Sequence, residues 1–219
     1  MLEGLGLQLK APLPRVVDAL RSTGITFLFA PAWHPALVNL APLRRSLGVR
    51  TVFNLLGPLV NPLRPQAQVL GVARDTLLDP MAGALQRLGL QRAIVVHGAG
   101  GLDEASLAGS NQLRLIEKGE VRSLSLTAEQ LGLESAPLEA LRGGDLSMNS
   151  TILEQVLRGQ GDAAQRDVVA LNTALVLWVA GVEQDFSVGA AMARQSLDQG
   201  HPWQRLEALR RALADGDGQ

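Results

Sequence analysis

Two adjacent carboxylates follow a glycine-rich turn in the stretch IVVHGAGGLDEASLAG, residues 94–109. An apolar run typical of a buried strand ends at His97, and Asp103 and Glu104 come directly after the glycines. In open α/β sheets, ligands bind outside the carboxyl ends of the strands. Mg²⁺ keeps several waters and takes one or two carboxylates, so a magnesium-bound diphosphate would suit this pair. The pair is also typical of a helix N-cap with a first-turn acid, and the motif alone favours that structural interpretation.

A second candidate lies upstream, in FAPAWHPALVNLAPLRRSLG, residues 29–48. His34 precedes a proline at the start of an expected helix, and Arg44 and Arg45 lie near its end. An arginine mounted on a helix suits bidentate recognition of a small carboxylate. For the arginine pair alone, a solvated basic face is the simpler explanation.

A strand–helix–strand pattern positions the acids. Residues 68–72 and 93–97 are expected to form strands, and Asp79 is expected to cap the helix between them. Such a βαβ unit predicts a right-handed crossover and parallel strands. Two alternating runs in residues 112–126, on either side of Lys118-Gly119, predict a hairpin.

The later part of the chain is expected to be helical. Thr151 and Glu154 have capping-box spacing before the apolar run that ends at Gly159. Residues 167–180 are expected to form a buried helix, since this run is too short to span a membrane. The predicted class is α/β, with a central, mostly parallel sheet flanked by helices. Residues 63–219 would form this domain, and residues 1–62 would be the remnant of a helical domain and a hinge.

Composition excludes several classes of partner. The net charge of -1 gives no reason to expect nucleic acid or an anionic membrane. Aromatic residues make up 3% of the chain, too few for a stacking platform for single strands. The chain has no cysteine, which fits a reducing, cytoplasmic compartment, and its first residues lack the pattern of a secretory signal. The three histidines are too scattered for a metal cluster.

Three blocks connect these candidates, in the order FLFAPAWHPAL, APLRRSLGVRTVFNLLGPLVNP and VVHGAGGLDEASLAG. Their order and spacing resemble the anthranilate phosphoribosyltransferases of tryptophan biosynthesis over essentially the whole chain. The blocks FNLLGPLVNP and HGAGGLDE are specific, because a shared α/β fold alone would not supply them. The fold that this resemblance implies is the one shared by nucleoside phosphorylases and class III phosphoribosyltransferases.

The resemblance implies a reaction and the residues that serve it. The phosphoribosyl group of phosphoribosyl pyrophosphate (PRPP) would pass to the amine of anthranilate, giving N-(5-phosphoribosyl)anthranilate and diphosphate. Arg44 would bind the anthranilate carboxylate, and Asp103 and Glu104 would bind Mg²⁺ on PRPP. The residues that would line the anthranilate channel are Ala30, Pro31 and His34. No general base is assigned, because positioning and neutralisation of the leaving charge would carry most of the rate.

The sequence departs from the family pattern in two places. Val38 stands where the family has a basic residue, which has little consequence. The family's GTGGD loop, which cradles the diphosphate, and its KHGNR-type segment have no counterpart here. The sequence thus resembles the C-terminal two-thirds of the enzyme, and we expect these 219 residues alone to be a poor catalyst.

The oligomeric state and two alternative functions stay open. The family forms homodimers through its helical domain, and this contact could be lost here. The main alternative is a non-catalytic fragment or paralogue that binds a small carboxylate ligand. The HPAL and GLDE blocks argue against a pyrimidine nucleoside phosphorylase.

Overall fold

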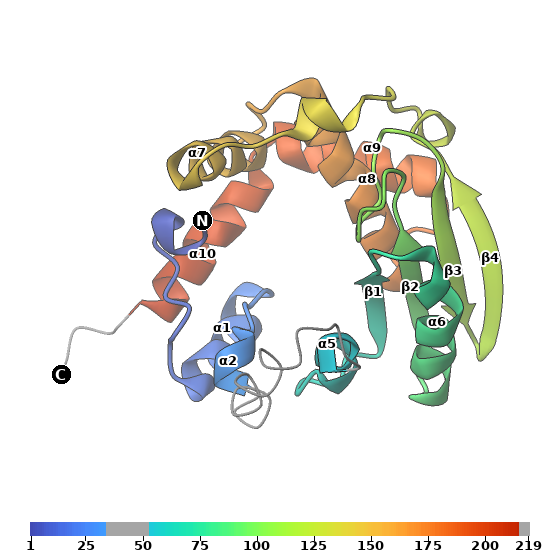
Figure 1. The fold of residues 1–219 in the computed structure, drawn as a ribbon. Helices are drawn as coiled ribbons and strands as arrows, with labels where there is room; N and C mark the ends of the chain where they lie inside the picture. The colour runs from blue at the N-terminus through green and yellow to red at the C-terminus, as the bar shows by residue number, and fades with distance from the viewer. Residues whose placement is uncertain (34–52, 215–219) are drawn as a thin grey trace, which may run out of the picture.

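The computed structural model describes residues 1–33 and 53–214. One four-stranded sheet stands on one side of an arch, α1, α2 and α10 stand on the other, and α7, α8 and α9 join them (Figure 1). The strands are β1 (Ala67–Gly71), β2 (Arg92–His97), β3 (Asn111–Glu117) and β4 (Glu120–Leu126). The described α-helices are α1 (Leu13–Thr23), α2 (Ala30–Trp33), α5 (Phe53–Leu56), α6 (Leu78–Arg87), α7 (Leu146–Leu157), α8 (Ala163–Val179), α9 (Phe186–Asp198) and α10 (His201–Leu213). Short 3-10 helices are η1 (Glu3–Leu5), η2 (Gly57–Val60), η3 (Asp75–Leu77), η4 (Glu129–Leu131) and η5 (Leu138–Leu141).

The sheet is mixed, with the strand order β1-β2-β3-β4. β1 and β2 are parallel and are connected through α6, whereas β2–β3 and β3–β4 are antiparallel. The α/β class is therefore confirmed, but in the described part of the chain only one of the three strand pairs is parallel. The predicted hairpin accounts for the antiparallel pair β3–β4: Lys118 (φ 51°) and Gly119 (φ 80°) both adopt the left-handed conformation that a two-residue hairpin turn requires.

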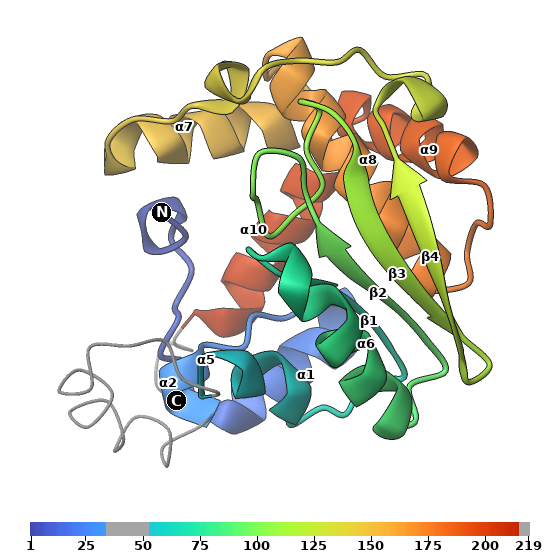
Figure 2. The same cartoon turned by 45° about the vertical axis from the view of Figure 1, so that its right-hand side comes forward.

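Alternating side chains of β2 build a core on each face of the sheet. Ile94 and Val96 pack in one cluster with residues of α8, among them Leu171 and Leu175. Val95 packs on the opposite face with Leu85 and other residues of α6. Figure 2 shows α6 in front of the sheet and α8 and α9 behind it. A strand buried on both faces reads as a continuous apolar run, which is the pattern of residues 93–96.

A third core joins the two ends of the described chain. Val16 and Ala19 of α1 pack with Leu209 and Leu213 of α10. The helix that follows the α/β elements in sequence therefore shares its core with the first residues. The proposed division at residue 62 stays a prediction.

No helix in residues 1–33 or 53–214 is long and apolar enough to cross a membrane.

Asp79 does not cap the helix as predicted. The N-cap of α6 is Leu77, and Asp79 lies within the first turn, where its carboxylate accepts hydrogen bonds from Arg114 of β3. Local spacing suggested a cap, but the 3-10 helix η3 runs directly into α6, so Asp79 lies inside the first turn and its carboxylate pairs with Arg114 instead. This ion pair fastens α6 to the face of the sheet.

The Asp79–Arg114 pair predicts a local pH dependence. The side-chain hydrogen bond from Arg114 holds the pKa of the Asp79 carboxyl below its ordinary value. Since the folded-state pKa is depressed, the stabilisation is present above the unfolded pKa of about 3.9 and is lost as the pH falls through the folded value. Arg114→Gln should return the pKa of Asp79 to its ordinary range in a carbon-detected NMR titration. Arg122→Gln on β4 is the control and should leave it unchanged.

Candidate functional site

The glycine-rich turn after β2 folds back on itself and presents the two acids. The backbone N–H of Gly98 donates to the carbonyl oxygen of Leu102 at 2.8 Å, and that of Gly101 donates to the carbonyl of Gly98 at 3.1 Å. Gly100 and Gly101 have φ values of 84° and 82°, a conformation that residues with a side chain rarely adopt. The turn therefore brings Asp103 to the carboxyl ends of the parallel pair β1 and β2.

Two other glycines let the acidic segment approach the strands. A Cβ atom on Gly71, the last residue of β1, would lie 1.5 Å from the carbonyl oxygen of Asp103. A Cβ atom on Gly98 would lie 1.9 Å from the carbonyl oxygen of Glu104. Gly71 and Gly98 thus make room for the backbone of the acids themselves.

The side chains of Asp103 and Glu104 are exposed on this segment. The helix-cap interpretation of the pair is wrong, because bends and irregular backbone lead from Glu104 to the start of β3. Carboxylate oxygens are the ligands that Mg²⁺ prefers, and two of them leave coordination positions for water and phosphate oxygens. Among the described residues, no group of three or more His, Asp or Glu could enclose a metal. The donor set thus fits a magnesium ion shared with a bound phosphate rather than a closed protein cage.

Asn111 holds the segment from inside. This fully buried side chain accepts hydrogen bonds from the backbone N–H groups of Ala99 (3.1 Å) and Ser106 (2.8 Å). Its amide nitrogen donates to the carbonyl oxygens of Ser106 and Leu126, both at 3.0 Å. One side chain therefore joins the turn, the residues after the acids and β4.

Asn172 of α8 holds the same segment through hydrogen bonds to Ala105. Its Oδ1 accepts from the N–H of Ala105 at 3.0 Å, and its Nδ2 donates to the carbonyl oxygen of the same residue at 2.8 Å. Asn172 lies within the expected buried helix of residues 167–180 and was not predicted as a functional residue. A polar residue in the middle of a buried helix was the available signal, because buried amides need hydrogen-bond partners.

A cavity of about 610 Å³ adjoins the acidic segment between α7 and α8. Glu104, Asn172 and Asn149 form part of its polar lining, whereas Ile152 and Val176 belong to its apolar lining. Asn149 accepts from the N–H of Gly144 at 2.9 Å and so orders the turn before α7. One wall of this cavity is therefore set by the same segment that carries the acids.

His97 has a structural role. Its Nδ1 lies 2.8 Å from the carbonyl oxygen of Val72, so Nδ1 carries the proton and donates it. This bond joins the end of β2 to the residue that follows β1.

The predicted anthranilate residues are described only in part. Ala30 and Pro31 lie in α2 and are exposed. His34 and Arg44 lie outside the described residues. In both views α2 lies beside α1 and apart from the turn that follows β2 (Figures 1 and 2). The channel itself stays a prediction.

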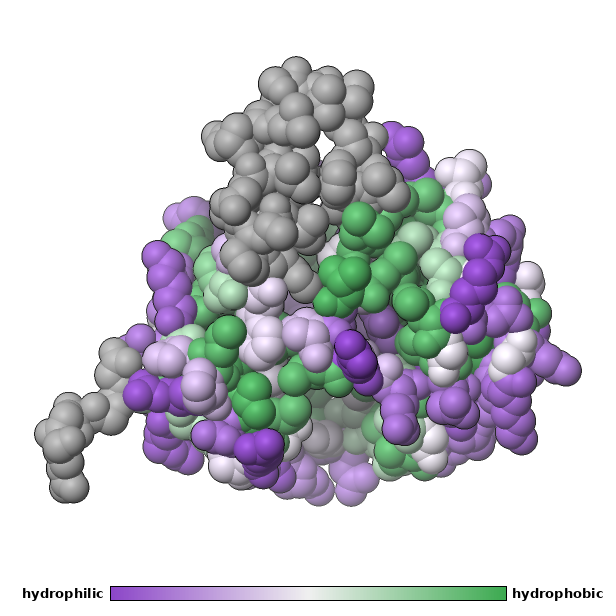
Figure 3. Space-filling model, turned by 90° about the horizontal axis from the view of Figure 1, so that it is seen from below, coloured by the Kyte–Doolittle hydropathy of each residue, from purple (hydrophilic) through white to green (hydrophobic). Residues whose placement is uncertain are grey.

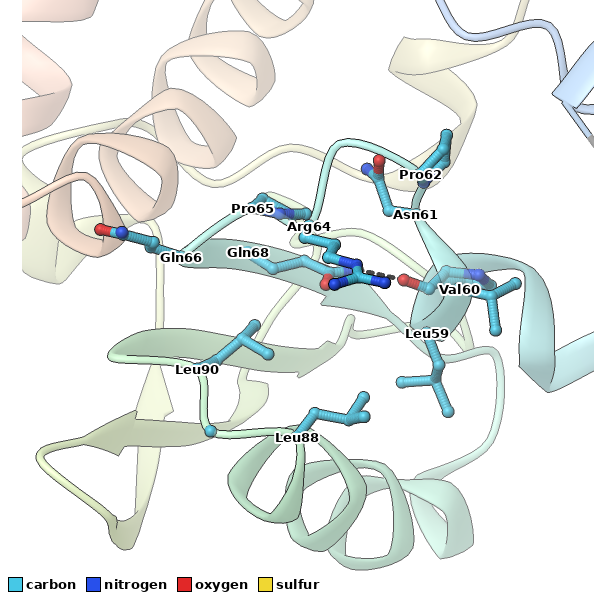
Figure 4. Close-up of a pocket in the computed structure, with 12 residues that line it drawn as sticks. Leu59, Val60, Asn61, Pro62, Arg64, Pro65, Gln66, Gln68, Leu88 and Leu90 are labelled. Atoms are coloured by element: carbon cyan, nitrogen blue, oxygen red, sulfur yellow. Dashed lines mark hydrogen bonds between the residues drawn. The ribbon is translucent and has the colours of Figure 1, made fainter.

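A separate cavity of about 660 Å³ lies at the opposite end of the sheet, where β1 begins. Seen from below, hydrophobic side chains gather next to the grey region, over the part of the chain that holds α5 and η2 (Figure 3). Leu59, Leu88 and Leu90 line the cavity, and the Gln68 amide donates a hydrogen bond of 3.0 Å to the carbonyl oxygen of Pro58, another residue of the lining (Figure 4). Among the described residues of its lining, Arg64 is the one charged residue, and none is an acid that could hold a cation.

Known proteins resemble the chain in sequence. Anthranilate phosphoribosyltransferase of Parasynechococcus marenigrum (strain WH8102) is 74% identical over 98% of this chain and 61% of its own length. The enzyme of the same name from Synechococcus sp. (strain CC9902) is 70% identical over 100% of this chain and 63% of its own length. The chain thus spans about three fifths of the length of these curated relatives.

Solved structures agree with the sequence comparison. Anthranilate phosphoribosyltransferase of Thermus thermophilus superposes with a TM-score of 0.91 at 44% identity, over 97% of this chain and 63% of that one. The Saccharomyces cerevisiae enzyme in complex with PRPP and Mg gives a TM-score of 0.88 at 28% identity, over 97% and 61%. The family model described as "Glycosyl transferase family, a/b domain" matches residues 1–202. The chain belongs to this glycosyl transferase family, and its resemblance to anthranilate phosphoribosyltransferases is confirmed.

Proposed function

We propose that this chain serves the transfer of the phosphoribosyl group from PRPP to anthranilate, with release of diphosphate, in tryptophan biosynthesis. The observation that carries the proposal is the acidic pair, which is exposed at the carboxyl ends of β1 and β2 and whose following backbone is hydrogen-bonded to Asn111 and Asn172. A relative with the same fold is named as a complex with PRPP and Mg. The proposed setting is a cytoplasmic homodimer, as in the family.

Asp103 and Glu104 are the proposed Mg²⁺ ligands. When bound, Mg²⁺ would neutralise charge on the diphosphate leaving group. The chain's own contribution is to fix the carboxylates before the ligand arrives, because ligands that need no reorganisation stabilise developing charge best. The exposure of both side chains leaves them accessible to a phosphate-bound ion.

Arg44 is the proposed partner of the anthranilate carboxylate, with Ala30, Pro31 and His34 beside the aromatic ring. A planar guanidinium matches a carboxylate through two parallel hydrogen bonds. Alanine substitution of Arg44, Pro31 and His34 in turn, together with Ala30→Gly, would separate substrate contacts from folding effects.

The function is best tested in a chimera in which this chain replaces the matching 63% of the T. thermophilus enzyme, to which it is 44% identical. Anthranilate is fluorescent, so its consumption with PRPP and Mg²⁺ can be followed directly. Turnover supports the transferase. Saturable anthranilate binding without consumption would favour the second candidate, a non-catalytic protein that binds a small carboxylate.

Arg44→Ala in this chimera should raise the KM for anthranilate far more than the KM for PRPP. Losing one charged hydrogen-bond partner costs about 1.5–3 kcal/mol, which corresponds to roughly a tenfold to hundredfold change. Steady-state kinetics with each substrate varied in turn measure the two constants. Arg45→Ala is the neighbouring control, with little change expected. Equal effects of Arg44→Ala on both substrates would instead indicate a role in folding.

A further inference from the structure

The side-chain amide of Asn172 can make its hydrogen bonds in only one of its two orientations. Its Nδ2 donates to the carbonyl oxygens of Ala105 (2.8 Å) and Val168 (2.9 Å), and its Oδ1 accepts from Ala105 at 3.0 Å. Reversing the amide would place its nitrogen opposite an N–H donor and its oxygen opposite two carbonyl acceptors. The orientation of the amide is therefore fixed by its partners.

The residue that Asn172 grips comes directly after Glu104. Ala105 is fully buried, and one side chain satisfies both its N–H and its carbonyl oxygen. On the other side of the same backbone, the carbonyl of Glu104 lies against Gly98, where no Cβ would fit. The peptide that links Glu104 to Ala105 is thus pinned between the turn after β2 and helix α8.

Asn172 fixes the backbone at the residue that directly follows Glu104. Asn111 fixes other parts of the segment, because it is hydrogen-bonded to Ala99 in the turn, to Ser106 and to Leu126 of β4. Asn172, 67 residues away from Ala105 in sequence, shares the lining of one cavity with Glu104. A polar group that holds a metal ligand in position without touching the metal limits how far that ligand can deviate from the geometry needed for binding.

We infer that Asn172 is a positioning residue for the cation-binding acids: by clamping Ala105 from α8 it sets the direction of Glu104 and raises the affinity of the acidic pair for a divalent cation. This inference rests on the proposed function, because it assumes that Asp103 and Glu104 are the cation ligands. In this role Asn172 contacts neither the substrate nor the metal and acts only through the backbone of Ala105.

The test uses Mn²⁺ alone as the probe on the 219-residue chain. Mn²⁺ shares the preference of Mg²⁺ for oxygen ligands, and it broadens the NMR signals of nearby amides. Wild type should show saturable broadening of amide signals in residues 98–106. Asn172→Ala should weaken the apparent affinity about tenfold, since the loss of groups behind metal ligands typically costs roughly 10–100-fold. Asn172→Leu, which keeps most of the volume and suits an apolar helix, is the second variant if alanine impairs folding.

Thr173→Val is the matched control. Thr173 is the next residue of α8 and lines the same cavity, but its hydroxyl donates to Val169 of its own helix. This variant should keep the wild-type affinity for Mn²⁺.

The outcomes separate the inference from the proposed function. If the double variant with Asp103→Asn and Glu104→Gln shows the same Mn²⁺ broadening as wild type, the proposed metal site is wrong, and the inference about Asn172 is wrong with it. If broadening needs the acids but a folded Asn172→Ala or Asn172→Leu variant binds Mn²⁺ within about twofold of wild type, Asn172 is only structural. A lower Tm with unchanged affinity has the same meaning.

Discussion

Replacing Asp103 by Asn and Glu104 by Gln together is expected to lower magnesium-dependent turnover of the chimera by at least about a hundredfold. Removing one preorganised group that stabilises developing charge typically costs roughly 10²–10³ in rate, and here both metal ligands are lost. The measurement is anthranilate consumption as a function of Mg²⁺ concentration. The amide side chains keep the shape of the acids, so the variant reports on charge and ligation alone.

Stability is the control for this double variant. Both side chains are exposed, and exposed substitutions usually change stability by less than about 0.5 kcal/mol. Thermal unfolding should therefore be unchanged. Full turnover with an unaltered magnesium dependence would show that the pair serves another purpose.

Adding a single methyl group at the end of β1 should have the largest effect on stability. The Cβ atom of Gly71→Ala would lie 1.5 Å from the carbonyl oxygen of Asp103, so the acidic segment must move away from the strand. Overpacking of this kind typically costs roughly 1–3 kcal/mol, and we expect about 3 kcal/mol because the neighbour is backbone. For a chain of this size, Tm should fall by roughly 6–12 °C.

Gly57→Ala is the matched control, because a Cβ atom there would meet no atom of residues 1–33 or 53–214 within 4 Å. Its Tm should stay close to that of wild type. Gly71→Ala should also weaken Mn²⁺ binding, since Asp103 is displaced. A Gly71→Ala variant as stable as Gly57→Ala would show that the contact between β1 and the acidic segment is looser than the structure has it.

Much of the α/β part could be predicted from local sequence. The strand at residues 93–97 is a continuous apolar run, and the hairpin has its glycine where the turn needs positive φ. The place of the acids after β2 followed from sequence order, because a strand end and the next loop are neighbours in the chain. Such features depend on residues only a few positions apart.

Features that depend on distant residues could not be predicted. Asp79 has the spacing of a helix cap, yet its partner is Arg114 on β3, 35 residues later. Gly71 looks like an ordinary residue at a strand end, and only the folded chain shows that Asp103 lies against it.

The start of α7 shows how one local signal can outrank another. The helix begins at Leu146 with Asp145 as its cap, ahead of Thr151 of the predicted capping box. The earlier cap prevailed because Asp145 accepts from the N–H of Met148 at 2.8 Å.

The core shared by α1 and α10 sets the order in which a nascent chain can fold. Hydrogen bonds from Arg15 to Ala214 and from Arg205 to Thr23 span 199 and 182 residues of sequence. At a translation rate of roughly 5–20 residues per second, α1 would wait roughly 10–40 s for α10 to be synthesised. Val16 and Ala19 stay uncovered by α10 throughout that interval, so this core forms only after nearly the whole chain has been synthesised.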